Sequence, residues 1–87
     1  MQITTKSGFT CDVDPDVLNS MELIDNLAEV QSGNSLAFSA VCLQVLGRET
    51  RAKLYDHLRN EAGRVPTRDV DRELTEILQA LGEPAKN

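Results

Sequence analysis

The chain is a short acidic polypeptide of 87 residues, of which 40% are hydrophobic and 26% charged, with a net charge of −5. A chain of this length forms one small domain with a thin core, since roughly 60–65% of the unfolded surface is buried at this size. Aromatic residues make up only 3% of the chain, so the core must be aliphatic. The acidic balance disfavours non-specific binding to nucleic acid and to anionic membranes.

The charge is unevenly distributed along the chain. Residues 1–47 carry one lysine and six acidic residues, a net charge of −5, whereas residues 48–87 carry eight residues of each sign. An acidic half of this kind can attract a partly basic partner. It can equally be a solvated surface that keeps the domain in solution, which is the simpler interpretation. Both interpretations stay open.

Features that would indicate export or a membrane are lacking in the sequence. Cys11 and Cys42 are too few and too far apart for a disulfide scaffold, and the sequence does not tell whether they touch. No apolar run approaches the roughly 20 residues of a membrane helix. The first residues resemble a polar strand rather than a signal peptide. We therefore expect a cytoplasmic protein with reduced thiols.

Residues 2–13 are predicted to form a β-hairpin. Lys6, Ser7 and Gly8 fit a three-residue loop, with the glycine in the left-handed conformation. Side chains alternate between the faces of a strand, so this loop places one set of residues on a single face: Met1, Ile3, Thr5, Phe9, Cys11 and Val13. The opposite face is polar. An isolated hairpin is marginally stable, so we expect the apolar face to pack on helices.

Four helices are predicted after the hairpin, over about residues 15–32, 35–46, 48–62 and 67–81. Asp14 and Pro15 suit the start of the first helix, and Asn19-Ser20 is a possible break within it. Gly63 is expected at the end of the third helix. The sequence thus predicts an α+β fold that is predominantly α, with an N-terminal β-hairpin packed on a bundle of about four short helices. This single domain spans residues 1–82, and residues 83–87 are expected to be a flexible tail.

The second predicted helix is unusual because it is apolar nearly all round. Between residues 35 and 46, only Ser39 and Gln44 are polar after the first position. Such a helix is buried on more than one side, which is demanding in so short a chain. Either it is the central helix, or part of it meets another chain. The candidate partner-binding residues are Leu36, Phe38, Val45 and Leu46, with Tyr55 at the edge. For each of them, the alternative is a plain core position.

The sequence contains no pattern that indicates catalysis, a cofactor or a metal. His57 is the only histidine, and its spacing places it off the apolar stripe of its helix, so we expect it at the surface. Zinc requires about four clustered ligands, and Cys11, Cys42 and His57 include no CxxC or HxxxH pair. No glycine-rich phosphate loop is present. We expect a protein that is not an enzyme and has no catalytic, cofactor-binding or metal-binding residues.

A DNA-binding regulator is an alternative. Seven of the nine basic residues lie between residues 48 and 72, and a short connector with a glycine joins the last two helices, as in helix-turn-helix units. However, acidic residues interleave with the basic ones. Asp69 and Asp71 lie at the start of the helix that would enter the groove, where they would approach phosphates. Binding to nucleic acid is therefore not the favoured interpretation.

Three segments resemble small tail assembly chaperone-like proteins, which long-tailed phages and prophages of Gram-positive bacteria encode. The segments are TTKSGFTCDVDPDVLNSMELIDNLAEV, LAFSAVCLQVLG and KLYDHLRNEAGRVPTRDVDRELTEIL. The resemblance extends from Ile3 to Leu81 and is most specific in LYDHLRNEAGRVP. Ser39 and Cys42 depart from the bulkier aliphatic or charged residues expected in the second helix.

The resemblance implies a non-enzymatic role. Proteins of this family cover the long hydrophobic helices of the tape measure protein until subunits of the tail tube displace them. The family has no catalytic residues to transfer, and no motif marks its contact residues. The resemblance and the apolar second helix both predict a protein that binds another protein, with the tape measure protein as the expected partner. A self-associating structural component of the tail, and hence a homo-oligomer, is a further alternative.

Overall fold

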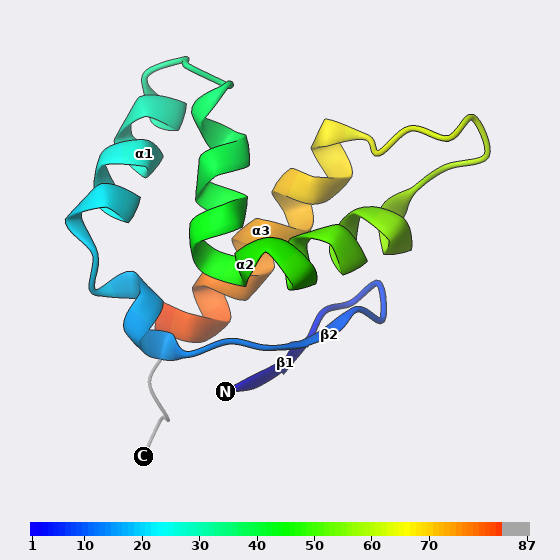
Figure 1. Cartoon of the computed structure of the whole chain (residues 1–87), viewed down its shortest axis with the longest axis horizontal. Coiled ribbons are helices and arrows are strands. Elements are labelled where there is room, and N and C mark those ends of the chain that lie inside the picture. Colours follow the sequence, from blue (N-terminus) through cyan, green and yellow to red (C-terminus); the bar gives the residue numbers. More distant parts are fainter. Residues whose placement is uncertain (83–87) are drawn as a thin grey trace.

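A computed structural model describes residues 1–82 of the chain, and in this part a β-hairpin is followed by three α-helices (Figure 1). The elements are β1 (Gln2–Thr4), β2 (Thr10–Asp12), the 3₁₀-helix η1 (Pro15–Leu18), α1 (Met21–Gln31), α2 (Ala37–Leu58) and α3 (Thr67–Gly82). The predicted class, mainly helical with an N-terminal hairpin, is confirmed. The described residues contain three α-helices rather than about four, and the tail predicted at residues 83–87 lies outside them.

The hairpin has the predicted register, with Ile3 opposite Cys11 in an antiparallel pair. The backbone N–H of Thr5 donates to the carbonyl oxygen of Phe9 at 2.9 Å and closes the loop. Five of the six residues assigned to the inner face are buried, and Met1 is exposed. The turn and the alternation of apolar and polar side chains therefore sufficed to predict this element.

The helix predicted over residues 15–32 is divided in two. Asp14 caps η1 by accepting a hydrogen bond from the backbone N–H of Asp16, and Ser20 then caps α1 by accepting one from that of Leu23. Ser20 has an extended backbone with φ of −146°, which no helix can contain. The break lies at Asn19-Ser20, where the sequence indicated a possible break. Serine favours the N-cap position over the interior of a helix.

The helices predicted over 35–46 and 48–62 form one element, α2, with a kink at Gly47. Gly47 has φ of 81° and ψ of 167°, a conformation that is essentially restricted to glycine. The kink changes the direction of the chain, so the two parts of α2 bury different faces. Val41, Cys42 and Val45 enter the core from the first part and Leu54 from the second.

The predicted end of this helix at residue 62 is wrong, since α2 ends at Leu58. Arg59 is extended, and Asn60 organises the chain beyond it. The side-chain oxygen of Asn60 accepts hydrogen bonds from the backbone N–H groups of Ala62 and Arg64, both at 3.0 Å. Gly63 has the predicted positive φ, 82°, but it belongs to this turn and not to a helix end. The asparagine side chain competes with helical hydrogen bonds and so ends the helix early.

The three helices and the hairpin enclose one aliphatic core. α3 contributes Val70, Leu74, Ile77 and Leu81, all predicted from its helical period, with Leu78 partly buried. In Figure 1, α1 and the first part of α2 run side by side in opposite directions, α3 crosses behind α2, and the hairpin lies beside the second part of α2. Residues 59–66 form a long connector that projects from the body and returns to the start of α3 (Figure 1).

Candidate protein-interaction groove

The most exposed large apolar side chain of residues 1–82 is that of Leu36, directly before α2. Its relative exposure is 86%, whereas most leucines of the chain are buried or half-buried. Leu36 takes the N-cap position of α2, and no side chain caps this helix end. A polar cap is the usual choice there, so local helix stability does not explain a leucine at this position.

Leu36 lies at the edge of a groove of about 420 Å³. Its lining comes from the start of α2, from the second part of α2, from the connector and from the start of α3: Ser35, Leu36, Phe38, Ser39, Tyr55, Arg59, Val65, Thr67 and Val70. Phe38, Tyr55 and Val65 are partly buried and pack against the core, while Val70 belongs to it. The groove therefore joins the hydrophobic core to the surface and remains open to an apolar side chain from outside.

A second hollow of about 610 Å³ also has Leu36 and Phe38 in its lining. Its other lining residues include Val30 at the end of α1, and Arg68 and Asp71 at the start of α3. The two apolar side chains are thus shared by two adjoining hollows. An extended or helical segment laid across them would contact both hollows at once.

Basic and aromatic residues recur every four positions towards the end of α2 and directly after it: Arg51, Tyr55 and Arg59. Tyr55 and Arg59 line the groove, and Arg51 does not. The Arg51 guanidinium lies over the Tyr55 ring, 5.8 Å from its centroid. Its Nη1 atom donates to both the carbonyl and the hydroxyl oxygen of Ser39, each at 3.3 Å. These contacts hold Tyr55 and Arg51 in place beside the apolar surface.

The structure brings together three of the five predicted partner-binding residues. Leu36, Phe38 and Tyr55 all line the groove. Val45 and Leu46 do not, since they are 3% and 9% exposed and belong to the core. This burial corrects the prediction that Val45 and Leu46 belong to a partner-binding surface. Both belong to the buried core cluster, which also includes residues of the hairpin, α1 and α3. Surplus apolar surface remains at the start of the segment, at Leu36, and at Leu43, which is 36% exposed.

Val65, Val70 and Arg59 line the groove but were not predicted as site residues. Val70 was assigned to the core from its helical period, and it is both core and groove floor. Val65 reaches the groove because the Asn60 turn brings the connector back over α2. This turn depends on the local hydrogen bonds of the Asn60 side chain, and no periodicity in the sequence indicates it.

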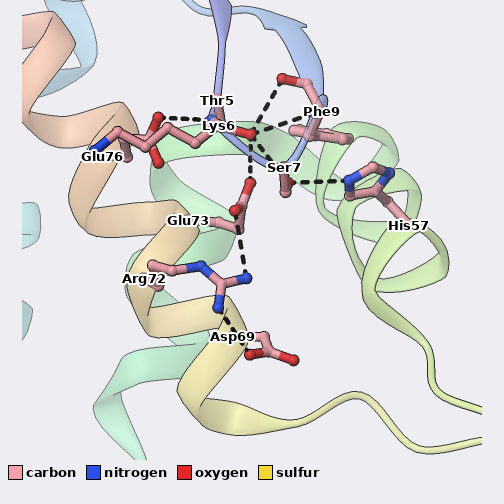
Figure 2. A network of polar contacts seen from close by, with 9 residues as sticks. All are labelled: Thr5, Lys6, Ser7, Phe9, His57, Asp69, Arg72, Glu73 and Glu76. Carbon is pink, nitrogen blue, oxygen red and sulfur yellow. Dashed lines mark hydrogen bonds and ion pairs between the residues drawn. The ribbon is translucent and has the colours of Figure 1, made fainter.

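The only fully buried charged residue of the described chain is Glu73 on α3, beneath the hairpin (Figure 2). The Thr5 hydroxyl donates to its Oε1 atom at 2.6 Å, and the Arg72 Nη2 atom lies 3.6 Å from Oε2. Oε2 has no hydrogen-bond partner within residues 1–82. Nearby, the backbone N–H of Lys6 donates to Glu76 Oε2 at 2.9 Å. These contacts attach the hairpin loop to α3, so the group is a structural anchor.

His57 contacts the same hairpin loop. Its Nε2 atom is 3.1 Å from the Ser7 hydroxyl, and its ring lies 5.5 Å from that of Phe9 (Figure 2). A serine–histidine pair is one part of a nucleophilic site, which also needs a group that orients the histidine and a pocket. Within residues 1–82, no side chain hydrogen-bonds Nδ1 of His57, and neither residue lines the groove. The geometry is that of an exposed packing contact.

Cys11 and Cys42 are both buried free thiols. Burial raises the pKa of Cys42 to about 11, and burial together with the charges of Asp12 and Glu73 raises that of Cys11. A raised pKa suppresses the reactive thiolate, so both side chains act as small apolar core residues. Within residues 1–82, no three acidic, histidine or cysteine side chains gather as a metal cluster would require.

Comparison with known proteins finds no matching family model, no similar curated protein and no similar solved structure. Among residues 1–82, no helix has the length and apolar character needed to cross a membrane. The function must therefore be argued from the groove and its chemistry.

Proposed function

We propose that this protein is a non-enzymatic interaction domain that binds an apolar helical segment of another protein in the groove beside α2. The observation that carries the proposal is Leu36, 86% exposed at the edge of a groove lined by Phe38, Tyr55 and Val65. Burying one such leucine contributes about 1.5–3 kcal/mol, which a monomer forgoes while the residue is exposed. A partner that covers it recovers this free energy.

An amphipathic helix is the partner best suited to this surface. Such a helix presents apolar anchors one turn apart and buries them in a hydrophobic groove. The two hollows that share Leu36 and Phe38 offer adjacent places for successive anchors. Tyr55 and Arg59 add the residue types that contribute most to binding in protein interfaces.

The resemblance to tail assembly chaperones names a client. We propose that the client is the tape measure protein of a long-tailed phage or prophage, whose long helices need cover before the tail tube assembles around them. A chaperone for such helices combines exposed apolar surface with a charged, solvated body. The net charge of −5 supports this combination.

Co-expression with fragments of a tape measure protein tests the proposal. We expect the protein to co-purify with an apolar helical fragment and to increase the fraction of that fragment in the soluble extract. Leu36→Asp should abolish both effects without unfolding the domain. Met21→Asp is the matched control, because Met21 is also exposed, at 68%, but does not line the groove. Equal behaviour of the two variants would remove the groove from the interaction.

The alternatives predict different measurements. A DNA-binding regulator would retard duplex DNA in a gel at low salt, and Arg64→Ala with Arg68→Ala would abolish the shift. A self-associating tail component would show oligomers that grow with concentration in light scattering and that Phe38→Asp reduces. Neither result is expected of a chaperone that is monomeric before it meets its client.

A further inference from the structure

The charge at the groove is opposite to that of the protein as a whole. Arg59 is the only charged residue in its lining. Arg51 lies eight residues earlier, outside the lining, and contacts Tyr55 and Ser39, which both line the groove. No acidic side chain lines this groove, although the chain carries a net charge of −5. The guanidinium groups of Arg59, which pairs with Asp56, and of Arg51 therefore stand at the groove of an acidic protein.

Neither arginine uses all of its N–H groups in hydrogen bonds within residues 1–82. A guanidinium carries five N–H groups. Those of Arg51 make hydrogen bonds through Nη1 alone, to Ser39, and Arg51 forms no ion pair within residues 1–82. Arg59 donates to the carbonyl of Gly63 at 3.1 Å and to exposed Asp56 at 3.2 Å. An exposed ion pair of this kind is weak and easily exchanged.

Covering the groove removes water from these donors. A buried donor without an acceptor costs more free energy than the hydrogen bond would have contributed, and charged donors cost the most. An apolar helix that filled the groove but offered only lysines or alkyl groups on its flank would incur that cost. A helix with carboxylates on its flank would instead form charge-assisted pairs with both arginines.

We propose that the occupant of the groove is an amphipathic helix whose apolar ridge is flanked on one side by glutamate or aspartate, and that Arg51 and Arg59 select it. This inference rests on the proposed function and specifies the chemistry of the partner. Asp56, 3.2 Å from Arg59, competes with the acidic flank for this guanidinium, and Asp71 lines the adjoining hollow. Acidic residues more than about 8 Å away are largely screened at physiological salt. Tyr55 lies between the two arginines and packs against the ridge.

Fluorescently labelled model helices test the inference. Three covalently stapled peptides share one leucine ridge and carry glutamate, glutamine or lysine on one flank, and a fourth has the glutamate flank with serine on the ridge. Binding to the full-length protein is measured by fluorescence anisotropy at low and at physiological ionic strength. With two weak pairs at stake, we expect the glutamate peptide to bind roughly tenfold more tightly than the glutamine peptide. The lysine and serine-ridge peptides should bind most weakly.

Variants of the arginines test which side chains cause the preference for the glutamate peptide. Arg51→Gln with Arg59→Gln should bring the glutamate and glutamine peptides to nearly equal affinity, because the difference between the two peptides depends on the two guanidinium groups. Arg48→Gln is the control, because Arg48 is an exposed arginine of α2 that does not line the groove, and it should keep the preference. Added salt should narrow the difference between the two peptides.

The outcomes separate this inference from the proposed function. Equal binding of the glutamate and glutamine peptides, or tighter binding of the lysine peptide, overturns the inference and leaves a helix-binding groove. No binding by any peptide overturns both. Displacement of the bound peptide by single-stranded oligothymidylate, or concentration-dependent dimers that Leu36→Asp abolishes, would assign the groove to a nucleic acid or to a second copy and also overturn the inference.

Discussion

Removing the hydroxyl of Thr5 should destabilise the domain more than removing the carboxylate that it binds. Thr5 is 4% exposed and donates to Glu73 Oε1 at 2.6 Å, while the other oxygen of Glu73 already lacks a hydrogen-bond partner within residues 1–82. Thr5→Val keeps the shape and leaves a buried carboxylate with no hydrogen bond to either oxygen. We expect a loss of about 2–3 kcal/mol in the free energy of unfolding. A domain of this size has only ~4–13 kcal/mol in total.

Glu73→Leu should cost less than about 1 kcal/mol, because it removes the buried charge as well as the bond. The Thr5 hydroxyl still reaches the carbonyl oxygen of Phe9, at 3.4 Å, and Arg72 keeps its ion pair with Asp69. In the Glu73→Leu background, Thr5→Val should therefore cost less than it does alone, because only the hydrogen bonds between the hydroxyl and the backbone of Phe9 remain to be lost.

Urea unfolding followed by circular dichroism measures these differences. For Thr5→Val the midpoint should fall by on the order of 2 M urea, since small domains have slopes near 1 kcal/mol per M. Thr4→Val is the control, because Thr4 lies on the exposed face of the same strand. If Glu73→Leu proved more destabilising than Thr5→Val, the carboxylate would be a net stabilising group and the reasoning would be refuted.

Three further predictions concern the kink, the thiols and the groove. Gly47→Ala should lower the free energy of unfolding by about 1–3 kcal/mol, because alanine rarely adopts the backbone conformation of Gly47. Gly82→Ala is the control and should be neutral or stabilising. Equal effects of the two substitutions in urea unfolding would argue against a strained kink. The stability contributed by protonated Cys42 should be constant below pH 9 and fall between pH 9 and about 11, because the thiol of the unfolded chain loses its proton first. A free energy of unfolding that does not change with pH in this range would contradict the raised pKa of Cys42. Leu36→Ser should change stability by less than ~0.5 kcal/mol while Val45→Ala costs ~2 kcal/mol, and thermal melts that ranked them the other way would place Leu36 in the core.

The start of α2 shows what an apolar sequence pattern predicts and what it leaves undecided. The run from residue 35 to residue 46 predicted more apolar surface than a small monomer hides, and it included both Leu36 and Val45. Their exposures, 86% and 3%, differ because Leu36 lies in the loop before α2, whereas Val45 packs in the core among residues of other elements. Hydropathy reports how much apolar surface exists and does not report which part is covered, since coverage depends on elements far away in the sequence.

The hairpin and α3 were determined by the sequence alone. Both depend on local rules: the loop at Gly8 sets the strand register, and the period of Val70, Leu74 and Ile77 sets the buried face. The groove and the burial of Glu73 were decided only by the tertiary structure. Each of them requires segments that are distant in the chain to meet, and the free energy of such contacts is not encoded in any local pattern.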